Sequence, residues 1–196
     1  MRTSRTRATA VAVVAVWLMG FGAAQAQMQP QPMATPPGWM DATLRAEALM
    51  KRGAHMDAAA IYEQYSATVP WFPASHYLRV QALLKAKRTD LVAAALAAAR
   101  TGIPRTAPMR SEAAMFALSV VADVPGLPRA DVSRLITEAH ALADEAMAAD
   151  PRSGEAMRMK ARVLMDQAEK LETDAARKAA LEKQADALME KSFRGR

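Results

Sequence analysis

The chain repeats ATLRAEALMKRGAHMDAAAIYEQYSATVP (residues 42–70) as HYLRVQALLKAKRTDLVAAALAAARTGIP (residues 76–104), 34 residues later. Five aligned pairs mark the two copies: Ala46 with Val80, Leu49 with Leu83, Ala58 with Val92, Tyr62 with Leu96, and Pro70 with Pro104. The apolar residues of each copy fall at helical spacing. Gly53 is placed to end a first helix with a left-handed residue, and the closing prolines end a second one. Each copy therefore predicts a helical hairpin.

A 34-residue period with a small residue, a large apolar residue, a second small residue, an aromatic and a closing proline resembles the tetratricopeptide repeat. The segment ALADEAMAADP, residues 141–151, is the closest single match to that family. The resemblance covers about residues 41–191. It implies an all-α fold, a right-handed α-solenoid of three to four tetratricopeptide-like helical hairpins. Another α-solenoid of helical hairpins is the alternative.

The strict period holds for two units and then breaks. Pro104 and Pro151 are 47 residues apart, so 13 extra residues fall in the turn at 123–128 and in a longer helix after it. Thr89 and Ser153 are the expected N-caps of their helices. We predict helices over 41–52, 56–68, 74–86, 89–99, 109–121, 129–149, 153–171 and 174–191.

Composition limits the function classes. Apolar residues make up 52% of the 196 residues and aromatic residues only 5%, and alanine dominates the apolar set, which favours closely packed helices. The chain has no cysteine, so disulfides, thiolate metal sites and cysteine nucleophiles are excluded.

Charge is unevenly distributed along the chain. Residues 74–110 hold seven Lys/Arg against one acid, whereas residues 111–150 hold two against seven. The alternatives are a solvated dipolar surface and a functional electrostatic groove. The net charge of +6 includes three arginines within residues 1–26. The remaining +3 is weak for nucleic-acid binding, so we expect no nucleic-acid partner.

The N-terminus has the pattern of an export signal. Residues 1–26 combine three arginines, an apolar run and the small-x-small sequence Ala24-Gln25-Ala26, which predicts a Sec-type signal peptide cleaved after Ala26. An uncleaved anchor is the alternative. Residues 27–40 are rich in proline and glutamine and predict a flexible tether, followed by the repeat domain over 41–196. We therefore expect a periplasmic protein without stable membrane insertion after cleavage.

The resemblance also implies a partner-binding groove on the first helices of the hairpins. Carrying the family's groove positions over by register gives Glu47, Met50, Lys51, Tyr77, Gln81, Leu84, Lys85, Ser111, Met115, Leu118, Arg158, Arg162 and Met165. This mixture of apolar centres and basic flanks suits an acidic and hydrophobic protein or peptide partner.

Residues that could carry chemistry are few. His140 and Asp144 lie four apart on one helix face, which fits an ion pair better than a metal site because no third ligand follows at a known spacing. The aromatic residues Tyr62, Tyr65, Trp71, Phe72 and Tyr77 gather at the first repeat junction and predict packing between hairpins, with a stacking platform as the alternative. No phosphate loop, nucleophile elbow or HExxH motif is present. We expect no enzyme activity, no cofactor and no metal.

These observations predict a non-catalytic periplasmic scaffold or adaptor that binds another protein. The alternative is an accessory protein that handles a small ligand or copper, using the aromatic junction or Met28, Met33 and Met40 in and beside the tether. A third hypothesis is an enzyme subunit that completes a partner's site.

Overall fold

The computed structural model describes residues 35–194, which fold into eight helices. The expected signal peptide, its cleavage site and residues 27–34 of the expected tether lie outside the described residues. The helices are α2 (Trp39–Lys51), α3 (His55–Thr68), α4 (Pro73–Lys85), α5 (Thr89–Gly102), α6 (Ala107–Asp123), α7 (Arg129–Ala149), α8 (Gly154–Lys170) and α9 (Ala175–Arg194).

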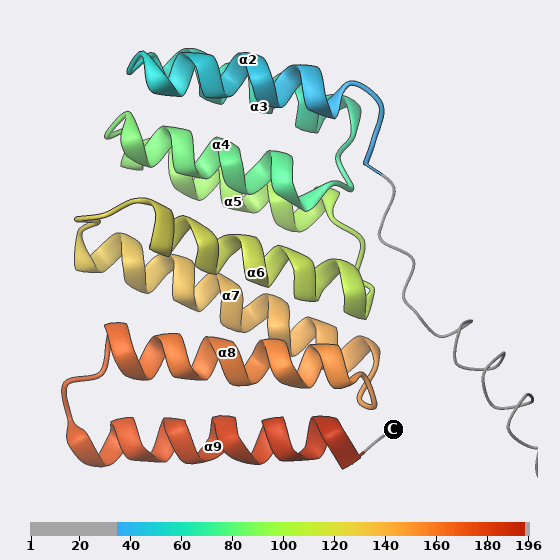
Figure 1. Cartoon of the computed structure of the whole chain (residues 1–196), viewed down its shortest axis with the longest axis vertical. Helices are drawn as coiled ribbons and strands as arrows, with labels where there is room; N and C mark the ends of the chain where they lie inside the picture. Colours follow the sequence, from blue (N-terminus) through green and yellow to red (C-terminus); the bar gives the residue numbers. More distant parts are fainter. Residues whose placement is uncertain (1–34, 195–196) are drawn as a thin grey trace, which may run out of the picture. The chain divides into compact units, whose positions relative to one another are not determined.

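The helices pack as consecutive pairs, α2 with α3, α4 with α5, α6 with α7 and α8 with α9. Successive pairs join because α3 packs on α4, α7 packs on α8, and the first helices α4, α6 and α8 contact one another in turn. Figure 1 shows the first helices of the pairs in one layer and α3, α5 and α7 behind them. The connections inside the pairs all lie on one side, which we call the turn edge. The predicted all-α arrangement of helical pairs is confirmed.

The 34-residue period extends one helix further than expected. The first helices α2, α4 and α6 begin at Trp39, Pro73 and Ala107, each 34 residues after the last, and only α8 departs by beginning at Gly154. The extra residues lie in α6, which has 17 residues against 13 in α4, in the connection 124–128, and in the 21-residue α7. The bounds of α7 match the predicted helix over 129–149.

Local sequence explains some of the helix ends. The Ser153 hydroxyl accepts a hydrogen bond from the Ala156 amide at 3.1 Å, as expected of an N-cap. Gly53 has the left-handed φ of 77° expected after α2. The predicted cap at Thr89 is wrong, because Thr89 is the first residue of α5 and Arg88 occupies the N-cap. The turn is closed one residue earlier by Lys87, whose φ is 58°.

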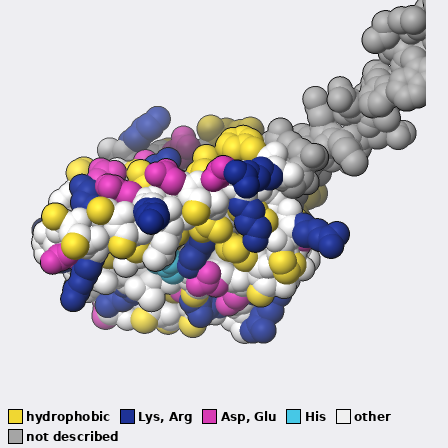
Figure 2. All heavy atoms as spheres, turned by 90° about the horizontal axis from the view of Figure 1, so that it is seen from below, with side chains coloured by type: hydrophobic (Ala, Val, Ile, Leu, Met, Phe, Trp, Pro, Cys, Tyr) yellow, Lys and Arg dark blue, Asp and Glu magenta, His cyan; other side chains and the backbone are white. Residues whose placement is uncertain are grey.

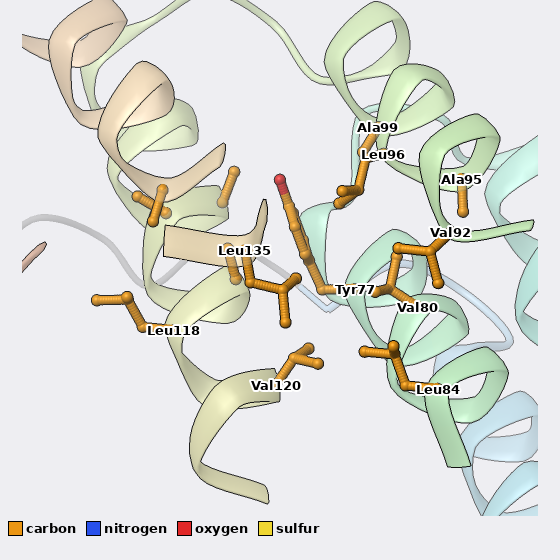
Figure 3. Packing of buried hydrophobic residues seen from close by; sticks show 14 of the residues in the cluster. Tyr77, Val80, Leu84, Val92, Ala95, Leu96, Ala99, Leu118, Val120 and Leu135 are labelled. Carbon is orange, nitrogen blue, oxygen red and sulfur yellow. The ribbon is translucent and has the colours of Figure 1, made fainter. Parts of the chain in front are cut away.

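Small and large side chains have different positions in the core. Buried alanines, among them Ala46, Ala95 and Ala139, let neighbouring helices approach closely. Large apolar residues fill the space between pairs. Figure 3 shows Tyr77 of α4 between side chains of α5 on one side and side chains that include Leu135 on the other.

The aromatic junction forms in part: Trp39 joins it, and Tyr77 lies instead in the main core. Trp39 at the start of α2 packs against Tyr62, Tyr65 and Phe72, with ring centroids 6.0, 5.1 and 4.8 Å apart. The Tyr65 hydroxyl donates to the carbonyl of Pro37 at 3.1 Å. Residues 36–40, expected to belong to the tether, are thus held against the first pair.

Buried charges join the second and third pairs. The Arg110 side chain is 1% exposed and donates to the carbonyls of Arg100 and Ile103 at 3.1 and 2.9 Å. Its Nε lies 3.2 Å from a carboxylate oxygen of Glu145 on α7. Arg100 itself pairs with Glu138 at 2.9 Å. This network satisfies the C-terminal carbonyls of α5 and fixes α6 and α7 against them.

Candidate functional site

The structure divides the predicted groove residues into core and surface. Tyr77, Leu84, Ser111 and Leu118 are buried, with exposed fractions from 0 to 8%. Tyr77 therefore belongs to the core between the pairs and is not offered to a partner. The exposed members are Glu47, Lys51, Met115, Arg162 and Met165. The half-buried members are Met50, Gln81, Lys85 and Arg158.

Two of the predicted surface residues meet in one groove. Met115 of α6 and Arg162 of α8 line a cavity of about 550 Å³ between these helices, which we call the α6–α8 groove. Leu118 forms part of its floor. The other lining residues are Ser119, Ala122, Met159, Asp166, Glu169 and Lys170. Members from α2 and α4, such as Glu47 and Gln81, do not line this groove.

The two walls of the α6–α8 groove differ in chemistry. The α6 wall is mostly apolar, and Met115 is 45% exposed there. The α8 wall is charged, but the charges are partly neutralised because Arg162 Nε lies 3.0 Å from Asp166 Oδ2. Asp166 is buried and Arg162 is largely exposed, so the guanidinium keeps free donors at the rim. Such a groove suits an apolar side chain flanked by an acidic group.

Sequence reasoning missed several lining residues that a simple signal could have found. Ser119 lies four positions after Met115, and Met159 and Asp166 lie three before and four after Arg162. Neighbours at these offsets share a helix face. Extending each predicted contact along its own helix would therefore have recovered them.

The aromatic junction is closed to ligands on most of its surface. Tyr62, Tyr65 and Phe72 are buried, and Trp71 alone of the predicted aromatic set is exposed, at 38%. Burial also raises the pKa of Tyr62 to about 12, with the Glu47 carboxylate adding to the effect. These rings pack on one another and leave no open stacking platform among themselves.

His140 and Asp144 do not pair directly as predicted. Lys160 of α8 lies between them, with its ammonium 2.7 Å from Asp144 Oδ1 and 3.0 Å from His140 Nδ1. His140 Nε2 donates to Gln167 Oε1 at 2.6 Å. Burial lowers the pKa of His140, and the Lys160 charge lowers it further. The neutral imidazole thus joins α7 to α8, and its Nδ1 lone pair faces the lysine.

Within residues 35–194 no three His, Asp or Glu side chains gather closely enough to hold a metal ion. Over the same residues no helix is both long and apolar enough to cross a membrane. Figure 2, seen from the α9 end, shows Lys/Arg, Asp/Glu and apolar side chains intermixed.

No family model matches the chain, and no curated protein matches it either.

Proposed function

We propose that this protein is an exported, non-catalytic adaptor of tetratricopeptide-like architecture, whose helical pairs form a right-handed α-solenoid. Residues 1–26 act as a Sec-type signal peptide, and the mature protein works in the periplasm. Three first helices in strict 34-residue succession support the architecture. The arginine-rich start, the apolar run and the small-x-small site support export.

The α6–α8 groove is the observation that carries the adaptor function. An open cavity of about 550 Å³ with exposed methionine on one wall and an arginine on the other accepts an amphipathic segment of a partner protein. Methionine suits this role because its flexible side chain adapts to the partner's shape. The partner segment that fits is apolar with a neighbouring acidic residue.

Affinity capture with a groove variant tests the proposal. Protein beginning at Gln27 is used as bait for a periplasmic extract, and bound proteins are identified by mass spectrometry. Met115→Glu places a carboxylate in the groove and should abolish capture of the specific partner. The matched control is Met189→Glu on α9, because Met189 is similarly exposed, at 37%, and lies outside the groove. A set of captured proteins that Met115→Glu leaves unchanged contradicts the proposal.

A further inference from the structure

A second depression follows the turn edge. Two cavities of about 500 and 350 Å³ share His55, Lys85 and Lys87, so they join along the turns of the first two pairs. We call the larger cavity and this shared border the turn-edge groove. It has no lining residue in common with the α6–α8 groove.

The apolar wall of the turn-edge groove comes from the place where the repeat breaks. The connection 124–128 lines it, together with Leu84 at the end of α4. Val124 and Leu84 are buried beneath it, and Leu127 is half-buried at its side. The corresponding turns 52–54 and 86–88 have three residues each and supply no such wall. The longer third connection therefore creates the cavity.

The opposite wall is cationic, although Asp57 lines the smaller cavity together with Lys85 and Lys87. Lys85 and Lys87 make no ion pair or side-chain hydrogen bond with any other residue in the described part of the chain. Neighbouring Arg88, in contrast, is held by two bonds to Asp90. The acid that lines the larger cavity, Asp131, is bound by Arg134 at 2.8 Å. The groove thus presents two free ammonium groups.

The backbone at Lys87 is strained. Its φ of 58° lies in the left-handed region, where a side chain is unfavourable. The aligned residue of the first repeat is Gly53, which adopts its φ of 77° without that cost. A lysine at a position suited to glycine indicates a use for its side chain.

Helix ends add little to the positive potential, because α3, α5 and α7 each carry an aspartate in the first turn: Asp57, Asp90 and Asp131. The second helices α3, α5 and α7 begin at the turn edge, and none of them has a side-chain hydrogen bond at its N-cap. Thr89 in the first turn of α5 and His55 at the start of α3 both line the groove. His55 Nδ1 is buried without a hydrogen-bond partner.

We propose that the turn-edge groove binds a small organic carboxylate. The carboxylate lies between the ammonium groups of Lys85 and Lys87, and the apolar body lies against the connection 124–128. The cavity volume of about 500 Å³ is in the range typical of small-molecule sites. The groove combines an apolar wall, the connection 124–128, with the two lysines Lys85 and Lys87. It therefore favours a ligand that has a negatively charged end and an apolar end. The site does not depend on the adaptor function.

Octanoate is the probe, and the full chain is titrated with it while backbone amide shifts are followed by NMR. We expect saturable one-to-one binding with the largest shifts at Lys87 and Gly126. 1-Octanol, which has the same apolar chain without the charge, should bind at least tenfold more weakly, because it cannot make the charged contacts. Equal affinity for both probes, shifts centred elsewhere or a lack of saturation would overturn the proposal.

Charge-removing variants locate the site. Lys85→Gln and Lys87→Gln should each weaken octanoate binding about tenfold, the loss expected for one charged hydrogen bond. The matched control is Lys51→Gln, because Lys51 aligns with Lys85 in the first repeat and lies outside the groove. An equal loss with Lys51→Gln would show general attraction to positive charge and reject the site. Met115→Glu should leave octanoate affinity unchanged, which separates this test from that of the adaptor function.

Discussion

Lys87 combines an unfavourable backbone conformation with a proposed role in ligand binding. The Lys87 and Arg88 amides donate to the carbonyls of Leu84 and Leu83, so the turn that ends α4 is well satisfied. The cost lies in the left-handed conformation of a residue that has a Cβ atom. The same turn after α2 uses Gly53, and the two turns therefore make a controlled comparison within one chain.

Replacing Lys87 by glycine should stabilise the fold. We expect Lys87→Gly to raise the free energy of unfolding by about 1 kcal/mol, since relief of the left-handed strain exceeds the extra chain entropy of glycine. Urea denaturation measures the change. The reverse substitution, Gly53→Lys, should lower it by about the same amount. A gain in stability together with loss of octanoate binding would show that the binding loss does not come from unfolding.

Buried histidine makes stability depend on pH. His76 is 3% exposed, and its Nε2 lies 2.8 Å from the Pro70 carbonyl. Burial lowers the pKa of His76, and the Arg79 charge lowers it further, while the Pro70 hydrogen bond opposes the shift. The unfolded state therefore binds a proton first as pH falls through the unfolded pKa of about 6.5. The lowered pKa of His140 acts in the same direction.

We therefore expect the free energy of unfolding to be constant between about pH 7.5 and 9 and to fall as the pH drops below about 6.5. Urea denaturation across this range measures the slope. His76→Gln should reduce the slope, because glutamine does not titrate and can still donate to Pro70. An unchanged slope in that variant would show that His76 is not responsible.

At the scale of elements, Arg110 of α6 connects the end of α5 to α7 through its contacts with the Arg100 and Ile103 carbonyls and with Glu145. Arg110→Met should lower the free energy of unfolding by about 3–5 kcal/mol, because it leaves Glu145 and two carbonyl groups without their buried partner. Arg88→Met is the control, since the Arg88–Asp90 pair is exposed to solvent and its loss should destabilise the fold far less. Thermal and urea denaturation measure both variants. Equal small losses would mean that solvent reaches the Arg110 network.

The elements also show what sequence patterns can and cannot predict. The period located the first helices because spacing and proline ends are local properties, and α7 was bounded correctly by Pro128 and Asp150-Pro151. The groove residues were less predictable. Register placed Tyr77 on the open face, but its exposed fraction is 0% because the alanine-rich pairs leave a space that a large ring fills. Trp39 was missed because its partners lie 23 or more residues away.

At the scale of the whole molecule, the first and last helices are held in different ways. At the N-terminal end of the helical pairs, the Trp39 ring packs among Tyr62, Tyr65 and Phe72. Phe72 is the N-cap residue of α4, so this cluster ties the first pair to the second. At the other end, α9 packs on α8 and buries Ala185 and Ser192, both of them small. The cluster of Ala161, Leu164 and Ala185 is separate from the main core.

This asymmetry predicts the order in which the ends open. Apolar area contributes about 25 cal/mol per Å², so the aromatic cluster stabilises α2 more than Ala185 and the half-buried Leu181 and Leu188 stabilise α9. In native-state hydrogen exchange, we expect amides of α9 to be protected at least about tenfold less than those of α2, because a row of stacked helical pairs opens from its weaker end. Trp39→Ala should bring the protection of α2 down toward that of α9 and leave α9 unchanged. Equal protection of both helices in the unaltered protein would instead show that all four pairs open together, as one cooperative unit.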